Sequence, residues 1–323
     1  MTIDHARSSA PPPRPSLLRE ARRLTALGLP IVVSLAASSL IWVVDTIMIA
    51  PLGTIPLAAA SVTGAVIMIF YAALYGYVSV AGVRMAEAFG NNDSHALSVA
   101  TRTAVLIGAI SGLVGSLAML ALRPAMTYLG QPAEVLAIMG GYWTCMSFLL
   151  VPFTVFYAIK SLFDAIDAPW IGVALAFLSV ILNVPANYVL IYGIGNWEGF
   201  GLLGAGLASA LSQTVPILPA WIIWKRARST REARQPAPVT GREANIQLKE
   251  GSIIALGYVG EGGAYSVAAL MLGWISAAAL AAQQIVSSVA TVLYMVPLGI
   301  AIAVSIRISQ AVGANERYRL PRI

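Results

Sequence analysis

Two carboxylates lie inside long apolar runs, where ionisable side chains are rare. Asp45 stands within the run Trp42–Thr46, and Glu261 stands among glycines in the run Gly260–Gly263. A charge at membrane depth costs about 2.5–3.5 kcal/mol on insertion scales, so such a residue is a candidate for function by default. For each of them the alternative is a place near a helix end, where water reaches the carboxylate.

Two asparagines form a second polar pattern in an apolar run. Asn183 and Asn187 are spaced i,i+4 and therefore share one face of a helix. Pro185, between them, removes one helical hydrogen bond and frees a carbonyl, and we expect a helix kink there and at Pro30. Two amide oxygens near a carboxylate suit a hard cation, which prefers oxygen ligands. The alternative is hydrogen bonding between helices, worth about 1 kcal/mol or less.

Residues for other chemistry are scarce. The two histidines, His5 and His95, fall in polar segments, and Cys145 is the single cysteine. We therefore expect no disulfide, no resident metal or cofactor, and no enzyme active site within the membrane. The net charge is +6, and the basic residues that produce it lie in the segments between apolar runs. This distribution favours a membrane topology over nucleic-acid binding. Lys160, Asp164 and Asp167 are expected to form a solvated helix end.

The composition indicates a polytopic membrane protein built only of helices. Hydrophobic residues make up 58% of the chain and charged residues 11%, against about 25% charged residues in a soluble domain. A helix that crosses the bilayer needs about 20 mostly apolar residues, and backbone groups in lipid must bond within their own segment. About eight segments of the sequence qualify: 24–49, 57–81, 99–122, 135–159, 169–192, 203–224, 252–274 and 278–305.

The basic residues predict the topology. With the N-terminus in the cytoplasm, all of the 20 Lys and Arg residues except Arg123 fall on the cytoplasmic side, as the positive-inside rule requires. We therefore expect four parts along the chain. They are a disordered cytoplasmic tail, a lobe of six helices, a basic cytoplasmic loop and the first two helices of a second lobe: 1–23, 24–224, 225–250 and 251–323.

The chain also repeats itself. One constant shift along the sequence lays the first two segments over the last two without a gap, so that Gly76 falls on Gly299 and Arg84 on Arg307. Apolar helices resemble one another by composition alone, but the matching polar ends are harder to obtain by chance. Parallel repeats related by an axis along the membrane normal are a transporter architecture.

Five stretches together resemble the MATE family, the multidrug and toxic-compound extrusion transporters, and especially its bacterial branch with a Glu in the seventh helix. The resemblance covers about residues 20–316, and these stretches carry it: Val44–Met48, Leu182–Tyr188, Gly204–Gly206, Met295–Gly299 and Ser305–Arg307. It implies two six-helix lobes in a bacterial inner membrane and efflux of cationic or amphipathic drugs by antiport against H⁺ or Na⁺. By position, Asp45, Asn183 and Asn187 match the cation site of the N-lobe, and Glu261 matches an acidic residue of the C-lobe.

The sequence departs from that pattern in its extent. The family has twelve helices, whereas this sequence stops where the loop to the ninth would begin. Two further expectations therefore remain open: a second chain that supplies the missing helices, and a fragment that does not transport. A flippase for lipid-linked sugars of the same superfamily is another alternative, although the acidic membrane interior argues against the basic cavity that it would need.

Overall fold

Long helices make up almost the whole chain. The computed structural model describes the backbone of residues 17–128, 132–275 and 277–323, and the side chains of these residues apart from 265–289, 291, 292 and 322. No β-sheet occurs in this part, which confirms the all-α prediction. The long helices are α1 (Leu17–Ile49), α2 (Thr54–Gly90), α3 (Ser94–Leu122), α4 (Ala133–Phe148), α5 (Leu150–Ala165), α6 (Pro169–Tyr192), α7 (Leu202–Thr214), α8 (Ile217–Arg226), α9 (Gly241–Ile275) and α10 (Ala277–Gly313). Short 3₁₀ turns are η1 (Ala50–Leu52), η2 (Arg123–Thr127), η3 (Glu232–Arg234) and η4 (Arg317–Arg322).

The described residues contain 7 helical stretches that are long and apolar enough to cross a membrane: Leu17–Leu52, Thr54–Gly90, Ser94–Thr127, Ala133–Ala165, Pro169–Tyr192, Leu202–Arg226 and Leu293–Gly313. The remaining predicted segment, 252–274, coincides with α9, and its side chains beyond residue 264 lie outside the described set. The chain is a multi-pass membrane protein.

Several helix boundaries differ from the sequence prediction. The predicted segment 203–224 is divided into α7 and α8 at Pro216, whose ring leaves the backbone without an N–H to donate. α1 already begins within the predicted tail, and α9 begins at Gly241, within the predicted loop. The first turns of α9 are polar and helical because Glu243 and Gln247 are buried and hydrogen-bonded to α2 and α3, through Arg84 and the carbonyl of Ala100.

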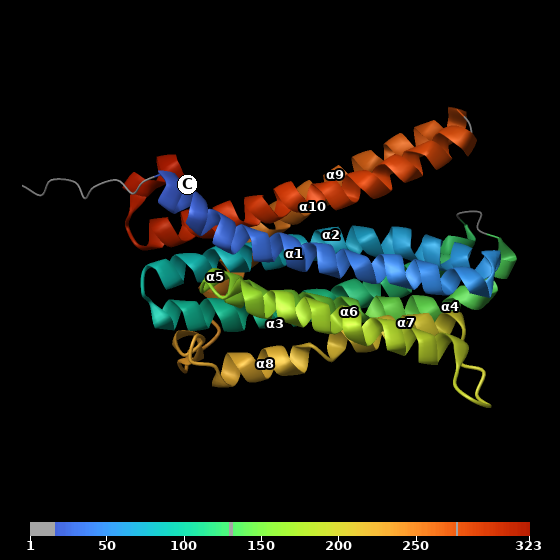
Figure 1. Cartoon of the computed structure of the whole chain (residues 1–323), viewed down its shortest axis with the longest axis horizontal. Coiled ribbons are helices and arrows are strands. Elements are labelled where there is room, and N and C mark those ends of the chain that lie inside the picture. Colours follow the sequence, from blue (N-terminus) through green and yellow to red (C-terminus); the bar gives the residue numbers. More distant parts are fainter. Residues whose placement is uncertain (1–16, 129–131, 276) are drawn as a thin grey trace, which may run out of the picture.

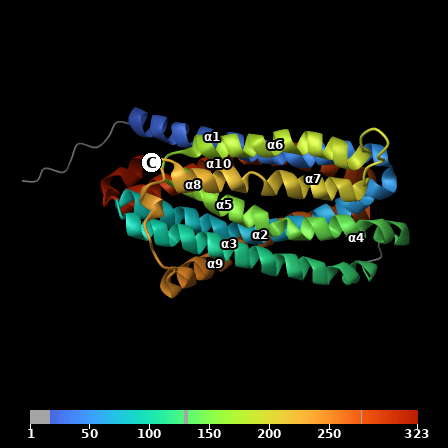
Figure 2. The same ribbon diagram turned by 90° about the horizontal axis from the view of Figure 1, so that it is seen from below.

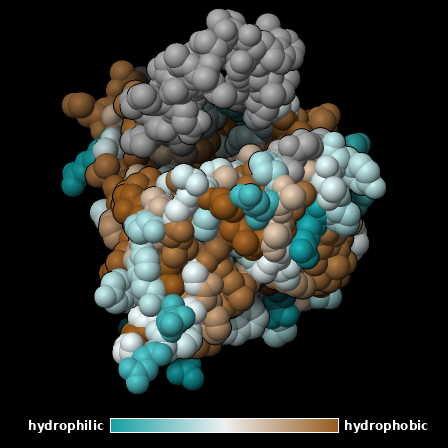
Figure 3. Space-filling view, turned by 90° about the vertical axis from the view of Figure 1, so that its right-hand side faces the viewer, coloured by the Kyte–Doolittle hydropathy of each residue, from teal (hydrophilic) through white to brown (hydrophobic). Residues whose placement is uncertain are grey.

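The first eight helices pack into one bundle, and α9 and α10 lie against it (Figure 1). α6 runs along both α1 and α7, as Figure 2 shows, and α3 runs along α5. The outward faces of these helices expose large apolar side chains, among them Leu117 and Ile181. Such outward faces are suited to lipid rather than water. The end of the bundle seen in Figure 3 presents a mixture of hydrophobic and hydrophilic residues.

The sequence repeat reappears as a contact. α9 packs on α2, and α10 packs on α1. A Cβ placed on Gly76 would lie 2.4 Å from the backbone N of Ala255, and one on Gly299 would lie 3.0 Å from the backbone N of Val32. The shift that lays Gly76 on Gly299 also lays Val32 on Ala255, so the two contacts are equivalent under the repeat. This is the pattern of an interface across a two-fold axis, and we call it the seam.

A second pair of close approaches follows the same rule. Gly90 faces the backbone of Gln310, and Gly313 faces the backbone of Glu87, both too closely for a side chain. The same shift lays Gly90 on Gly313 and Glu87 on Gln310. The seam is therefore held by two levels of backbone contact, one at Gly76 and Gly299 and the other near the ends of α2 and α10.

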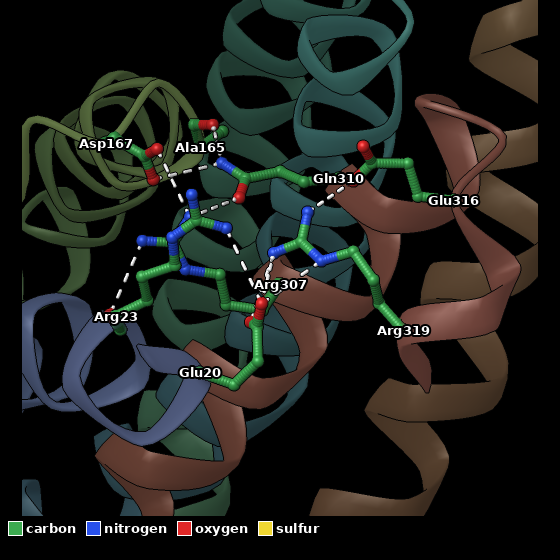
Figure 4. Close-up of polar contacts among 8 residues, drawn as sticks. All are labelled: Glu20, Arg23, Ala165, Asp167, Arg307, Gln310, Glu316 and Arg319. Atoms are coloured by element: carbon green, nitrogen blue, oxygen red, sulfur yellow. Dashed lines mark hydrogen bonds and ion pairs between the residues drawn. The ribbon is translucent and has the colours of Figure 1, made fainter. Parts of the chain in front are cut away.

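Ion pairs surround the level of the seam formed by Gly90 and Gly313. This level lies where α2 and α10 end, and we call this part the basic end of the bundle. Arg319 binds Glu20 with an N–O distance of 2.9 Å, and Arg307 binds Asp167 at 3.2 Å. Gln310 donates to the carbonyl of Ala165 at 2.8 Å. Figure 4 shows these groups converging from α1, α10, η4 and the turn between α5 and α6. On the other side of the seam, Arg84 binds Glu243 at 3.0 Å.

Gly76→Ala should weaken the seam. A Cβ on Gly76 would lie 2.4 Å from the backbone N of Ala255, which is closer than two such atoms can pack, so α2 and α9 would have to move apart. The expected loss of stability is about 1–3 kcal/mol, measured by thermal unfolding in detergent. The repeat predicts a similar loss for Gly299→Ala, whose Cβ would meet the backbone of Val32.

The matched control is Gly257→Ala on α9, where an added Cβ would meet nothing within 4 Å. This change should leave the stability unchanged or raise it slightly, because alanine favours the helix over glycine. Equal losses with Gly76→Ala and Gly257→Ala would show that α2 and α9 do not hold this register.

Candidate cation-binding site

Asp45 is a buried carboxylate between α1, α6 and α7. It lies on α1, four residues before the helix ends, and only 5% of its surface is exposed. Protein side chains therefore cover this carboxylate although it is close to a helix end, and its position at membrane depth stays a prediction. No ion pair of Asp45 occurs among the described residues. Its charge is balanced by neutral hydrogen-bond donors alone.

Three side chains donate to this carboxylate. The amide nitrogen of Asn183 lies 3.0 Å from Oδ1, and that of Asn187 lies 2.6 Å from the same oxygen. The hydroxyl of Ser209 lies 2.6 Å from Oδ2. All three donors are almost completely buried. Hydrogen bonds to a charged group are worth about 1.5–3 kcal/mol each, so this set can hold an ionised carboxylate away from water.

Helix geometry explains why these donors converge. The i,i+4 spacing puts Asn183 and Asn187 on the face of α6 that packs against α1. α7 returns along α6 and approaches it closely at Gly204, where a Cβ would lie 2.0 Å from the carbonyl oxygen of Leu190. This approach brings Ser209, five residues later, to the other oxygen of Asp45.

One acceptor in the cluster has no partner. Asn187 donates to the Oδ1 of Asn183 at 3.1 Å, but its own Oδ1 is buried and accepts no hydrogen bond from the residues that the structure describes. An unsatisfied buried carbonyl costs about 1–3 kcal/mol, and a proton or a monovalent cation bound beside Asp45 would satisfy it. The cluster thus combines a buried carboxylate with amide and hydroxyl oxygens, the ligands that a hard cation prefers.

A cluster of aromatic rings lies on the same part of α1 and on its neighbours. Trp42 meets Tyr71 edge-to-face at 5.9 Å between ring centroids, and Tyr71 lies 4.2 Å from Phe153. The hydroxyl of Tyr71 is buried and, among the described residues, has no partner. Trp42 lies three residues before Asp45 on α1, so the ring cluster and the carboxylate belong to the same part of the bundle.

The structure assembles most, but not all, of the predicted site. Asp45, Asn183 and Asn187 come together, whereas Glu261 lies on α9 with an exposed side chain, and none of the hydrogen bonds that Asp45 makes within the described residues comes from it. Ser209 was missed; its only sequence signal is its place three residues after the small-residue run Gly204–Gly206.

Two further expectations can be compared with the structure. Pro30 and Pro185 lie inside α1 and α6, which run on through both of them, and the kinks remain a prediction. The solvated helix end expected at Lys160, Asp164 and Asp167 is wrong for the first two. Lys160 and Asp164 are 6% and 5% exposed and bind each other at 2.7 Å, because α6 covers them and Gly172 leaves room for the lysine stem.

The MatE family model matches residues 30–189 and 254–323. A probable multidrug resistance protein NorM of Synechococcus sp. is 28% identical over 303 residues, which cover 92% of this chain and 65% of that protein. The protein of the same name in Pseudomonas aeruginosa is 30% identical over 310 residues, which cover 94% of this chain and 62% of that protein. The chain thus spans about two thirds of the length of these curated relatives.

Solved structures agree with this result at the level of the fold. The eukaryotic MATE transporter AtDTX14 superposes with a TM-score of 0.83 at 18% identity, over 95% of this chain and 68% of that one. An outward-facing multidrug resistance MATE transporter of the MOP superfamily superposes with a TM-score of 0.77 at 21% identity, over 94% of this chain and 68% of that one. Since the family model covers well over half of the sequence, the chain belongs to the MatE family.

Proposed function

We propose that this chain forms the ion-coupling part of a multidrug efflux antiporter, in which a proton or Na⁺ bound at Asp45 drives the export of a cationic or amphipathic drug. The buried, hydrogen-bonded but unpaired carboxylate carries this proposal. Family membership supports it, because MatE proteins are transporters and not enzymes, and relatives bear the name multidrug resistance protein. No cofactor is needed, because the ion gradient supplies the free energy.

The coupling step follows from the state of the carboxylate. An ionised Asp45 offers a counter-charge to a cationic drug, and ion binding removes it. The three donors then lose their charged acceptor, so α1, α6 and α7 repack and the drug is released. One carboxylate that alternates between drug and ion gives exchange without any covalent chemistry.

The seam then determines whether the coupling ion can reach the cytoplasm. We place the basic end in the cytoplasm of a bacterium, with the N-terminus on that side of the inner membrane, because positive residues gather there. In the structure the ion pairs around Arg307 and Arg319 close this end. Release of the coupling ion to the cytoplasm therefore requires that α9 and α10 separate from α1 and α2 by breaking the seam.

The coupling ion can be determined from the ligands that it needs. A proton needs only one oxygen of Asp45, whereas Na⁺ needs several oxygens and requires the amides of Asn183 and Asn187 to turn their Oδ1 atoms toward it. Purified protein should show this difference in the fluorescence of Trp42 and the other tryptophans. A response to NaCl that KCl does not reproduce indicates Na⁺, and a response to pH alone indicates H⁺.

Asp45→Asn should abolish drug efflux, because a neutral amide mimics the ion-bound carboxylate permanently. Ethidium efflux from cells that express a complete version of the transporter should fall to the background level while the amount of protein in the membrane stays the same. The same variant should lose the ion-dependent change in tryptophan fluorescence. Asp93→Asn is the matched control, because Asp93 is an exposed helix cap for which Asn is an equally good residue. Full efflux with Asp45→Asn would eliminate this mechanism.

Ser209→Ala should weaken the folded state through Asp45. It removes a 2.6 Å hydrogen bond to a buried charge, at an expected cost of about 1–3 kcal/mol. Thermal unfolding in detergent should show the loss in the wild-type background and a much smaller one in an Asp45→Asn background. Ser179→Ala is the control, because this buried hydroxyl on α6 donates to the backbone of its own helix, at the carbonyl of Leu175. Additive effects of Ser209→Ala and Asp45→Asn would show that Ser209 is only a packing residue.

A further inference from the structure

A cavity of about 220 Å³ lies inside the seam. On α2 it is lined by residues 75, 78, 79, 82 and 83, and on α10 by residues 298, 301, 302, 305 and 306. Each of these α10 positions is the repeat partner of one of the α2 positions, just as Gly299 is the partner of Gly76, so the cavity lies on the two-fold axis of the repeat. Along both helices it falls between the two levels of glycine contact described above.

The chemistry of the lining does not follow this symmetry. Tyr75 on α2 meets Tyr258 of α9 at 5.7 Å and Tyr157 of α5 at 5.8 Å between ring centroids. The positions that the repeat relates to Tyr75 and Tyr258 are Leu298 and Leu35, which also line the cavity. One wall is thus aromatic and the other is aliphatic.

A buried ion pair forms part of the same lining. Lys160 and Asp164 are the charged residues among those that line the cavity, and both come from α5. Lys160 donates to Oδ2 of Asp164 at 2.7 Å, while Oδ1 of Asp164 is buried and, within the described part of the chain, has no hydrogen-bond donor. A buried pair of this kind is weak evidence for stability, because removing both charges from water offsets their attraction.

We propose that this cavity is a second ligand site, used from the basic end, and that it binds a small aromatic amine whose ammonium pairs with Asp164 while its ring packs among Tyr75, Tyr157 and Tyr258. Carboxylates pair with ammonium groups, and the faces of tyrosine rings attract cations. Typical drug sites have volumes of about 300 Å³ or more, and this cavity is smaller, so the ligand is a small one. This inference rests on the separation of the lobes under the proposed function, because the ligand enters when the seam opens.

Lys160 then competes with the ligand's ammonium group for Asp164. In the closed seam its ammonium occupies the place on Asp164 that the ligand's ammonium would take. When the lobes separate, water enters, and the long lysine side chain can turn into it because it lies only five residues before the end of α5. Asp164 becomes free for the amine, and closure returns Lys160 and displaces the ligand.

The test is the binding of benzylamine to the purified full-length chain, measured by saturation-transfer NMR and equilibrium dialysis. Lys160→Met should bind it at least about tenfold more tightly than wild type, because the competing charge-assisted hydrogen bond is gone. Asp164→Asn should lose binding to a similar extent. Tyr258→Leu should weaken it by several-fold without touching the ion pair. Benzyl alcohol and benzoate are the neutral and anionic control ligands.

Two further variants keep the test decisive. Lys160→Met with Asp164→Asn removes both charges at once, so it should fold and bind no benzylamine even if the single lysine variant is unstable. Repeating the measurements in an Asp45→Asn background removes any benzylamine that the coupling carboxylate holds, so a difference between Asp164→Asn and its parent that persists there belongs to the cavity and does not depend on the coupling mechanism. The inference is overturned if benzoate binds in preference to benzylamine, if Asp164→Asn binds benzylamine normally, or if Tyr258→Leu has no effect.

Discussion

The burial of one carboxylate without a cationic partner is the constraint on which the rest of this structure depends. A charge such as that of Asp45 is tolerated in an apolar bundle only if donors surround it, and the chain supplies them from two other helices. α6 must therefore present its asparagine face to α1, and α7 must approach α6 closely enough for Ser209 to reach the second oxygen. The glycine at the α6–α7 contact is a consequence of that requirement. Because the donors are neutral, the charge can still be removed by an ion.

The parts of this architecture that were predictable from sequence are those that lipid dictates. Backbone groups in a bilayer must bond within a helix, so apolar runs became helices, and the i,i+4 spacing placed Asn183 and Asn187 together. Ser209 was not predictable, because a serine in a small-residue helix usually bonds to its own backbone. The burial of Lys160 and Asp164 was not predictable either. It arises from the cover that α6 provides and from packing across the seam, and no local pattern reports these contacts.

The repeat shows how a weak sequence signal can become a precise structural one. When α1 and α2 are laid over α9 and α10, the identical residues include glycines, polar residues near the helix ends and scattered apolar residues. In the structure, the glycines Gly76 and Gly299 are the points where α2 meets α9 and α1 meets α10. Only glycine permits such an approach of two backbones, so these shared glycines are the ones that the two-fold contact needs. Gly76 with Ala255 and Gly299 with Val32 are one contact made twice.

Symmetry of the scaffold and asymmetry of the chemistry have different causes. Under the proposed function, two halves that rock against each other about a shared axis need equivalent contacts, which agrees with glycine levels and a cavity lining that obey the repeat. A single charge that alternates between ion and drug would need to be present only once. The position that the repeat relates to Asp45 is Ala268, and the Lys160–Asp164 pair comes from α5, outside the part of the sequence that repeats. The first eight helices therefore carry the charges at both candidate sites, and in the proposed mechanism α9 and α10 supply the surfaces that open and close around them.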